Sequence, residues 1–416
     1  MKTKTTWQFV RTQDGRNYLA PFLLITMLFF LWGFAHSMLD VLNKHFQLSL
    51  QISMTQAAFV QNAVYGGYFL MAIPAGKLIS RFGYRAGVLT GLLLFGLGAL
   101  SFIPGSLLSG SPLAAFYCFV LSLFVIGCGL TCLETSANPY VTVLGEREAA
   151  ERRINFSQSF NGLGWILGPL VGLFLFREGA ENDDVVLPYA IIGVVVLAVA
   201  AVFSRAKLPE VEEEAGDETA ETATGTSSLW SRPHFVFGLL ALFLYVAAQT
   251  GLNSFFINYA TDEAVGISNS TATLLLSFVC MGLFMLGRLG GSWLMGHFRA
   301  ERLLVLFAIG ATAATAVIAL FGGRIGMIAL FVCYFCESIM FPTIFALAIR
   351  GLGEKTKQAS SYLIMSIVGG AIAPTLMAAV AETASMQAAF IVPLVCFTVI
   401  AAFALRYKKL LLSAKS

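Results

Sequence analysis

Apolar runs of about 20 residues recur along the whole chain, and short segments between them carry most of the charge. A helix of this length crosses the ~30 Å hydrocarbon core of a bilayer and satisfies its own backbone hydrogen bonds there. With 57% hydrophobic and 12% charged residues, the composition excludes a water-soluble domain. We therefore expect an all-α membrane protein. Its twelve predicted spans are 19–46, 55–80, 86–107, 112–143, 153–175, 187–204, 234–260, 270–296, 302–322, 326–349, 357–381 and 386–406.

Basic residues are divided unevenly between the two sets of loops. Of the 26 Lys and Arg, 22 fall in the N-terminal segment, the even-to-odd loops or the C-terminus. Lys44, Arg177 and Arg324 fall in the other loops, and Arg288 lies inside a span. Cytoplasmic loops are enriched in Lys and Arg, so both termini are expected in the cytoplasm. The basic residues form no patch interleaved with aromatic residues, so no nucleic-acid partner is expected.

One polar stretch, residues 205–232, interrupts the series of spans after the sixth. It is rich in Glu, Ala and Thr and nearly free of large apolar side chains. This composition favours a flexible linker over a folded domain. We expect it to join an N-terminal six-helix bundle, residues 1–204, to a C-terminal six-helix bundle, residues 233–416, on the cytoplasmic side.

The two groups of spans repeat one pattern in the same order. LWGFAHSMLD at 31–40 aligns without gaps with LYVAAQTGLN at 244–253. The matching positions include Asp40 with Asn253, and two pairs that each stand five residues before a proline, Glu134 with Glu337 and Gly164 with Gly369. Parallel six-helix repeats are the architecture of the major facilitator superfamily. In that architecture the first, fourth, seventh and tenth helices line a central cavity.

The same motifs resemble the fucose:proton symporter family of that superfamily. LWGFAHSMLD places an Asp eight residues after a Trp, and CLETSANPY at 132–140 matches the family's C-L-E-T-x-A-N-P. YVAAQT, PTIF and GKLISRFGYRAG are also similar, so the likeness covers nearly the whole chain. It implies a proton-coupled symporter that imports a monosaccharide across a lipid bilayer, with Asp40 and Glu134 essential. We expect a monomer in the plasma membrane, most simply the bacterial inner membrane.

The sugar itself stays open, because fucose-type members often have Asn-Asn where His36 and Ser37 stand. L-Fucose, mannose, glucose, galactose and N-acetylglucosamine are the candidates.

Two carboxyl groups are the predicted proton-coupling residues. Glu134 lies in the middle of an apolar span, where an ionised carboxylate is costly to bury, so it suits a group that loads and releases a proton. Asp40 lies late in the first span and accepts hydrogen bonds from sugar hydroxyls or takes a proton. The alternatives are a packing carboxyl at Glu134 and an interfacial helix cap at Asp40.

Further polar and aromatic residues in the spans are candidates for substrate binding. Amides and an imidazole suit the donors and acceptors of a sugar ring, although interhelical packing explains each of them equally well. Aromatic rings offer a face on which a sugar stacks. Arg288 and Glu337 either contact substrate or pair with another polar group. The binding candidates are His36, Asp40, Glu134, Gln158, Asn161, Gln249, Asn253, Trp32, Tyr245, Arg288 and Glu337.

No nucleotide-binding motif, nucleophile triad or metal-spaced cluster occurs in the sequence, so we expect neither an enzyme nor a cofactor, and no metal site. An ion gradient must then supply the free energy, at about 2.3 kcal/mol per charge for each 100 mV. Three alternatives remain at this point: a sodium-coupled sugar symporter, a drug:proton antiporter and a membrane sugar sensor that does not transport.

Overall fold

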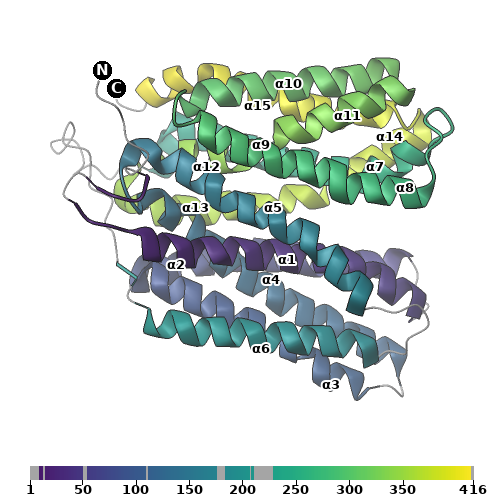
Figure 1. The fold of residues 1–416 in the computed structure, drawn as a ribbon, viewed down its shortest axis with the longest axis horizontal. Coiled ribbons are helices and arrows are strands. Elements are labelled where there is room, and N and C mark those ends of the chain that lie inside the picture. The colour runs from purple at the N-terminus through teal and green to yellow at the C-terminus, as the bar shows by residue number, and fades with distance from the viewer. Residues whose placement is uncertain are drawn as a thin grey trace.

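The computed structural model describes residues 9–12, 15–49, 54–108, 111–175, 183–206, 208–209 and 228–413, and within these ranges it is helical almost throughout (Figure 1). Most of the predicted linker, including residues 210–227, lies outside the described residues. The long helices of the first half are α1 (Leu19–Ser49), α2 (Met54–Leu100), α4 (Pro112–Val143), α5 (Ala150–Leu175) and α6 (Asp183–Arg205). The helices of the second half are α7 (Pro233–Thr261), α8 (Asn269–Leu274), α9 (Met281–Leu294), α10 (Ala300–Phe321), α11 (Gly323–Glu337), α12 (Met340–Ile349), α13 (Thr356–Met365), α14 (Ala373–Thr383) and α15 (Ile391–Ser413). A short α3 (Phe102–Ser106) follows α2.

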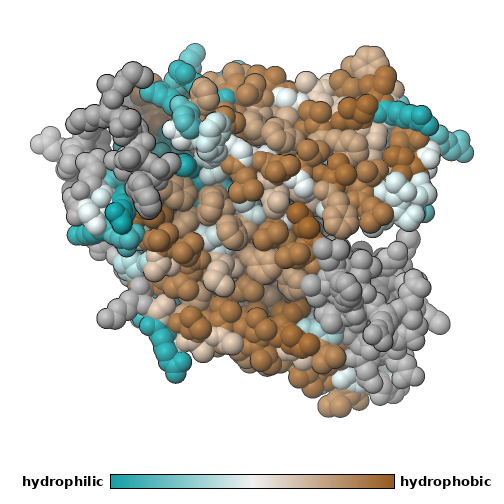
Figure 2. Space-filling view, in the orientation of Figure 1, coloured by the Kyte–Doolittle hydropathy of each residue, from teal (hydrophilic) through white to brown (hydrophobic). Residues whose placement is uncertain are grey.

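Ten described segments are long and apolar enough to cross a membrane. One of them, Asn62–Ser106, is 45 residues long and leaves helical geometry at Gly83 (φ 83°, ψ 171°), so it comprises two spans that meet at a basic turn. Glycine adopts this positive φ without steric cost. α5, less apolar because polar residues interrupt it, supplies the remaining span. The predicted all-α membrane fold with twelve spans is therefore confirmed, and Figure 2 shows the apolar band, with hydrophilic residues gathered toward its two ends.

The two halves form two groups of helices that lie side by side, with α5 of the first half packed against α9 and α12 of the second (Figure 1). The internal repeat is visible in their packing. A Cβ added to Gly164 would lie 2.6 Å from the carbonyl oxygen of Phe30, and one added to Gly369 would lie 2.5 Å from that of Phe243. Phe30 and Phe243 each stand one residue before the two aligned stretches, so they occupy equivalent positions. Each half thus uses a repeated glycine to bring its fifth helix against its first.

The tenth span, predicted as one helix over 326–349, is broken into α11 and α12 at Ser338 and Ile339. Pro342 explains the break, because proline has no N–H with which to bond the carbonyl oxygen four residues earlier. That oxygen belongs to Ser338, and it accepts a hydrogen bond from Nε of Arg288 instead (2.9 Å). Two other spans also depart from regular α-helix, with a π-helical turn at Leu275–Cys280 and a 3₁₀ segment at Ser366–Ala371.

Candidate substrate and proton site

Glu134 of α4 is buried, with 5% of its surface exposed, and the hydroxyl of Tyr68 on α2 donates a hydrogen bond to its carboxyl oxygen Oε1. Tyr68 is itself fully buried. A hydrogen bond to the carboxylate favours its ionised form, whereas burial favours the neutral form. Two opposing influences of this kind suit a group that binds and releases a proton. α4 continues as one helix through Pro139.

His36 lies beside this pair on α1. Its Nδ1 is 3.0 Å from the carbonyl oxygen of Trp32, one turn earlier. Its ring is 5.7 Å from the ring of Tyr68 and is stacked at 6.1 Å on Trp165 of α5. The imidazole therefore contacts the same tyrosine that binds Glu134. Asp40 is in α1 one turn further on, but its side chain lies outside the described residues, so its role stays a prediction.

α5 supplies two buried amides, and each contacts a neighbouring helix. Nε2 of Gln158 donates to Oδ1 of Asn138, one turn after Glu134 on α4 (3.1 Å). The carboxamide of Asn161 lies against α1, where its oxygen accepts from Nε1 of Trp32 (2.7 Å) and from the backbone N–H of Gly33 (3.2 Å). The opposite orientation would set the NH2 group against these two donors. Trp32, a candidate for sugar stacking, is buried against Phe29 in this conformation.

Arg288 of α9 crosses the boundary between the two halves. It is 3% exposed, and its guanidinium lies 4.3 Å from the ring of Phe284. One terminal nitrogen approaches the carbonyl oxygen of Gln158 (2.5 Å), the side-chain oxygen of Gln158 (3.2 Å) and the amide of Asn161 (3.3 Å). Arg288 therefore joins α5 to the break between α11 and α12.

The remaining candidates come from the second half. Tyr245 of α7 is fully buried and near enough to Arg288 to interact with it electrostatically. Glu337 is the last residue of α11 and has no exposed surface. Asn253 accepts a hydrogen bond from the hydroxyl of Tyr334 (2.8 Å), so it ties α7 to α11. Gln249 is half-buried on α7 and makes no hydrogen bond to another described residue.

The structure thus brings most of the candidates into one buried polar cluster, which we call the central cluster: Trp32, His36, Glu134, Gln158, Asn161, Tyr245, Arg288 and Glu337. Hydroxyls, amides, carboxyls and a guanidinium converge there from both halves. Because all of these groups except the half-buried His36 are buried, a ligand reaches them only when the halves separate on one side.

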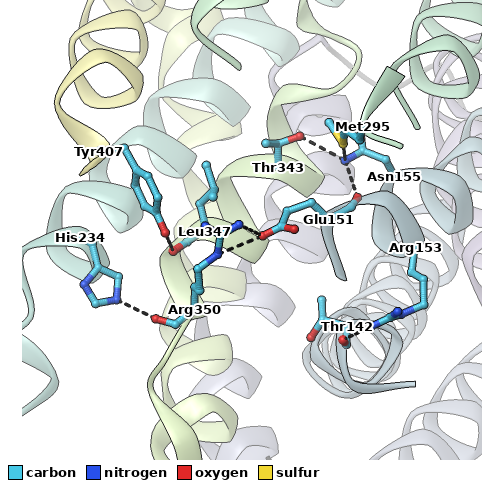
Figure 3. Close-up of polar contacts among 10 residues, drawn as sticks. All are labelled: Thr142, Glu151, Arg153, Asn155, His234, Met295, Thr343, Leu347, Arg350 and Tyr407. Atoms are coloured by element: carbon cyan, nitrogen blue, oxygen red, sulfur yellow. Dashed lines mark hydrogen bonds and ion pairs between the residues drawn. The ribbon is translucent and has the colours of Figure 1, made fainter. Parts of the chain in front are cut away.

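At the end of the molecule where both termini lie, direct contacts hold the halves together (Figures 1 and 3). Arg350, just after α12, forms an ion pair with Glu151 of α5. One turn further along α5, Asn155 donates to the hydroxyl of Thr343 (3.1 Å) and to the sulfur of Met295 (3.4 Å). This set, Glu151, Asn155, Thr343 and Arg350, is called the terminal gate below.

Arg153 fixes the loop beside the terminal gate. Its buried guanidinium donates to the carbonyl oxygen of Thr142 (2.5 Å; Figure 3). It also donates to those of Val141 (3.0 Å) and Glu146 (2.8 Å) around the turn from α4 to α5. A further bond reaches Phe9 near the N-terminus (3.1 Å). Carbonyls that the helix ends leave unsatisfied are thereby paired, and the start of α5 is held in place.

Sequence reasoning missed several of these residues. Tyr68 and Trp165 are aromatic residues in apolar helices, where packing is the ordinary explanation. Glu151 and Arg350 are charges at span ends, which the topology rule already explains. The signal for the terminal gate is a second element of the repeat, Leu-Gly-Glu at 144–146 and 352–354. A 3₁₀ turn follows the first of these at Arg147–Ala149, and a 3₁₀ turn at Gly353–Lys355 overlaps the second.

Comparison with known proteins agrees with this architecture. The chain matches the Major Facilitator Superfamily over residues 22–367. It is 36% identical to the L-fucose-proton symporter of Escherichia coli (strain K12), over 94% of each chain. It is also 34% identical to the glucose/galactose transporter of Brucella abortus (biovar 1, strain 9-941), over 95% of each chain.

Solved structures agree on the fold. The crystal structure of the transporter FucP in the outward conformation superposes with a TM-score of 0.83 at 35% identity, covering 94% of this chain and 99% of that one. A proton:xylose symporter bound to 6-bromo-6-deoxy-D-glucose superposes with a TM-score of 0.72 over 94% of this chain and 95% of that one. At 14% identity, this second likeness concerns the fold alone.

Proposed function

Because the chain belongs to the Major Facilitator Superfamily, we propose that it is a proton-coupled symporter that imports a monosaccharide. Relatives named for L-fucose and for glucose and galactose match nearly the whole chain. The substrate class is accordingly L-fucose or a related hexose such as mannose, glucose, galactose or N-acetylglucosamine.

The observation that carries this proposal is the buried pair of Glu134 and Tyr68 beside His36. A carboxyl group in a dry, apolar helix is costly unless a cycle uses both of its protonation states. A proton needs one acceptor, whereas a sodium site needs several oxygen ligands that converge on one point. In the proposed cycle, Glu134 carries the proton and Asp40 links its protonation to sugar release.

The sugar binds among residues that present mixed donors and acceptors. Gln158, Asn161 and Gln249 supply amides, and Trp32 and Tyr245 supply ring faces. Sugar hydroxyls replace some of the contacts that these groups make with one another when the halves are closed. The burial of the central cluster supports a cycle in which the halves separate before the sugar binds, because α1 and α5 must move away from the second half to expose these groups.

Transport proceeds by rocking of the two bundles, residues 1–204 and 233–416, about the central cluster, with residues 205–232 as the cytoplasmic linker. The terminal gate closes the cytoplasmic side, since both termini lie at that end and basic residues favour that face. The protein works as a monomer in the lipid bilayer of the bacterial inner membrane.

Counterflow in proteoliposomes tests the proposal and identifies the sugar. Vesicles are loaded with one unlabelled hexose, and entry of a labelled sugar is measured for fucose, mannose, glucose, galactose and N-acetylglucosamine in turn. At least one hexose should exchange, and an imposed proton gradient should then drive its accumulation. Failure of every hexose to exchange, with protein correctly inserted, would refute sugar transport.

A further inference from the structure

Glu337 is a second buried carboxyl group, in the half of the molecule opposite Glu134. Neither of its oxygens has a hydrogen-bond partner within the described part of the chain. Tyr68 binds Glu134, but no equivalent donor among the described residues reaches Glu337. An ionised carboxylate without partners in such a place is strongly unfavourable, so the neutral acid is the form that this conformation stabilises.

Among the described residues, Arg288 is the cation that acts on the carboxyl group of Glu337. Its Nε is bound to the carbonyl oxygen of Ser338, the residue next to Glu337. Even so, it forms no ion pair with Glu337, because its terminal nitrogen is directed to the backbone and side-chain oxygens of Gln158 on α5. The other titratable groups that act on Glu337 carry no positive charge: Tyr245 on α7, Cys280 in the π-helical turn, and Cys333, Tyr334 and Cys336 on α11.

The acceptors of Arg288 belong to the opposite bundle. When α5 moves away from α9, Arg288 must lose the two oxygens of Gln158. The guanidinium stays charged in proteins, so it then needs another anion or acceptor. Glu337 is the adjacent group able to supply one, and it does so by releasing a proton to the water that enters between α5 and α9.

We propose that Glu337 is a second proton-binding residue of this transporter: neutral while Arg288 contacts α5, and ionised and paired with Arg288 when the terminal gate opens. The proton leaves to cytoplasmic water and returns from it before closure. Glu337 therefore adds no net proton movement but makes gate opening sensitive to cytoplasmic pH. An acidic interior keeps Glu337 neutral and holds the gate closed. This inference rests on the proposed function for its direction of transport.

Infrared spectroscopy of the purified protein tests the protonation state without requiring transport. At neutral pH, the carbonyl stretching band of a protonated carboxylic acid should lose intensity in Glu337→Gln relative to the natural protein. Glu382→Gln, which alters an exposed carboxyl on α14, should leave the band unchanged. A spectrum of Glu337→Gln identical to that of the natural protein in this region would overturn the proposal. If Glu337→Gln does not fold, a displaced band in Glu337→Asp gives the same answer.

Counterflow at varied internal pH tests the gating role. Gln is permanently neutral, so Glu337→Gln should exchange sugar about tenfold more slowly at alkaline internal pH and should lose the slowing that the natural protein shows as the interior becomes acidic. An internal pH dependence equal to that of the natural protein would sink the gating role. Absence of exchange in the natural protein would instead count against the proposed function, and the infrared result would still stand.

Discussion

At the level of single residues, the buried carboxyl of Glu134, which we propose binds the proton, has one hydrogen-bond donor in an apolar helix. Tyr68 is that donor, and His36 packs on the ring of Tyr68. The Glu134 side chain therefore has a hydrogen bond for its ionised form and a dry environment for its neutral form.

Replacement of Glu134 by Gln should abolish uptake driven by a proton gradient while leaving sugar counterflow measurable. Gln keeps the shape and hydrogen bonding of the side chain but cannot cycle a proton. Both activities are measured in the same proteoliposomes, with the exposed Glu263→Gln as control. Proton-driven accumulation at the natural level in Glu134→Gln would contradict its role.

Replacement of Tyr68 by Phe should shift the pH dependence of uptake to higher external pH. The hydroxyl stabilises ionised Glu134, so its removal makes Glu134 hold a proton more tightly and load at higher pH. Release of the proton is then slower, and maximal uptake falls. The measurement is initial uptake rate against external pH. Tyr117→Phe, at an exposed position on α4, provides the control, and an unchanged profile in Tyr68→Phe would exclude the coupling.

Glu134, Arg288 and Glu337 were visible in the sequence because a charged residue in an apolar span requires an explanation. Their partners were not visible. Nothing in the sequence distinguishes Tyr68 from an aromatic residue that only packs. The contact of Arg288 with Gln158, 130 residues away in the chain, depends on how the two halves meet. Single residues can be singled out by the cost of burying them, but their pairing follows from tertiary packing.

At the level of helices, glycine and proline decide where segments approach and where they break. Pro342 frees the carbonyl oxygen that anchors Arg288, so the break in the tenth span is part of the site. The sequence predicts the spans because their length and apolarity follow from the bilayer. It does not predict that α11 and α12 separate, because proline within a membrane helix is compatible with a continuous helix, as α4 shows at Pro139.

Alanine at Gly164 or Gly369 should destabilise the protein by about 1–3 kcal/mol, because the new methyl group would overlap backbone atoms of the first or seventh helix. Gly290 is the matched control, since nothing lies within 4 Å of a Cβ added there. Gly290→Ala should be neutral or slightly stabilising. Thermal unfolding in detergent is the measurement, and equal stability of all three variants would show that the close packing of helices is not required.

The ion pair of Glu151 and Arg350 should favour closure of the terminal gate. In a Ser292→Cys background, the added thiol lies at the α5–α9 boundary, where Ser292 now bonds the carbonyl oxygen of Arg152. Glu151→Gln should increase its labelling by an impermeant maleimide in inside-out vesicles about fivefold, corresponding to about 1 kcal/mol. The control Glu148→Gln, at an exposed position, should leave the labelling rate unchanged. Equal labelling rates with and without Glu151→Gln would show that this ion pair does not help to close the terminal gate.

At the level of the whole molecule, the two halves meet through buried polar contacts in the middle and through the terminal gate at one end (Figures 1 and 3). Each half repeats the same series of six helices, and the proposed mechanism has the two halves move as bodies. The boundary between them carries Arg288, Gln158 and Asn155, whose partners must change when it opens. Duplication was readable in the sequence, whereas the conformation in which the halves meet was not.

The most direct test of proton-coupled sugar symport is the pH of the external medium when the exchanged hexose is added to proteoliposomes in the absence of sodium. The proposed mechanism predicts that the medium becomes more alkaline as protons enter with the sugar, that a protonophore abolishes accumulation, and that Glu134→Gln gives no pH change. An unchanged external pH, with accumulation that requires sodium and ignores the protonophore at a clamped membrane potential, would contradict it.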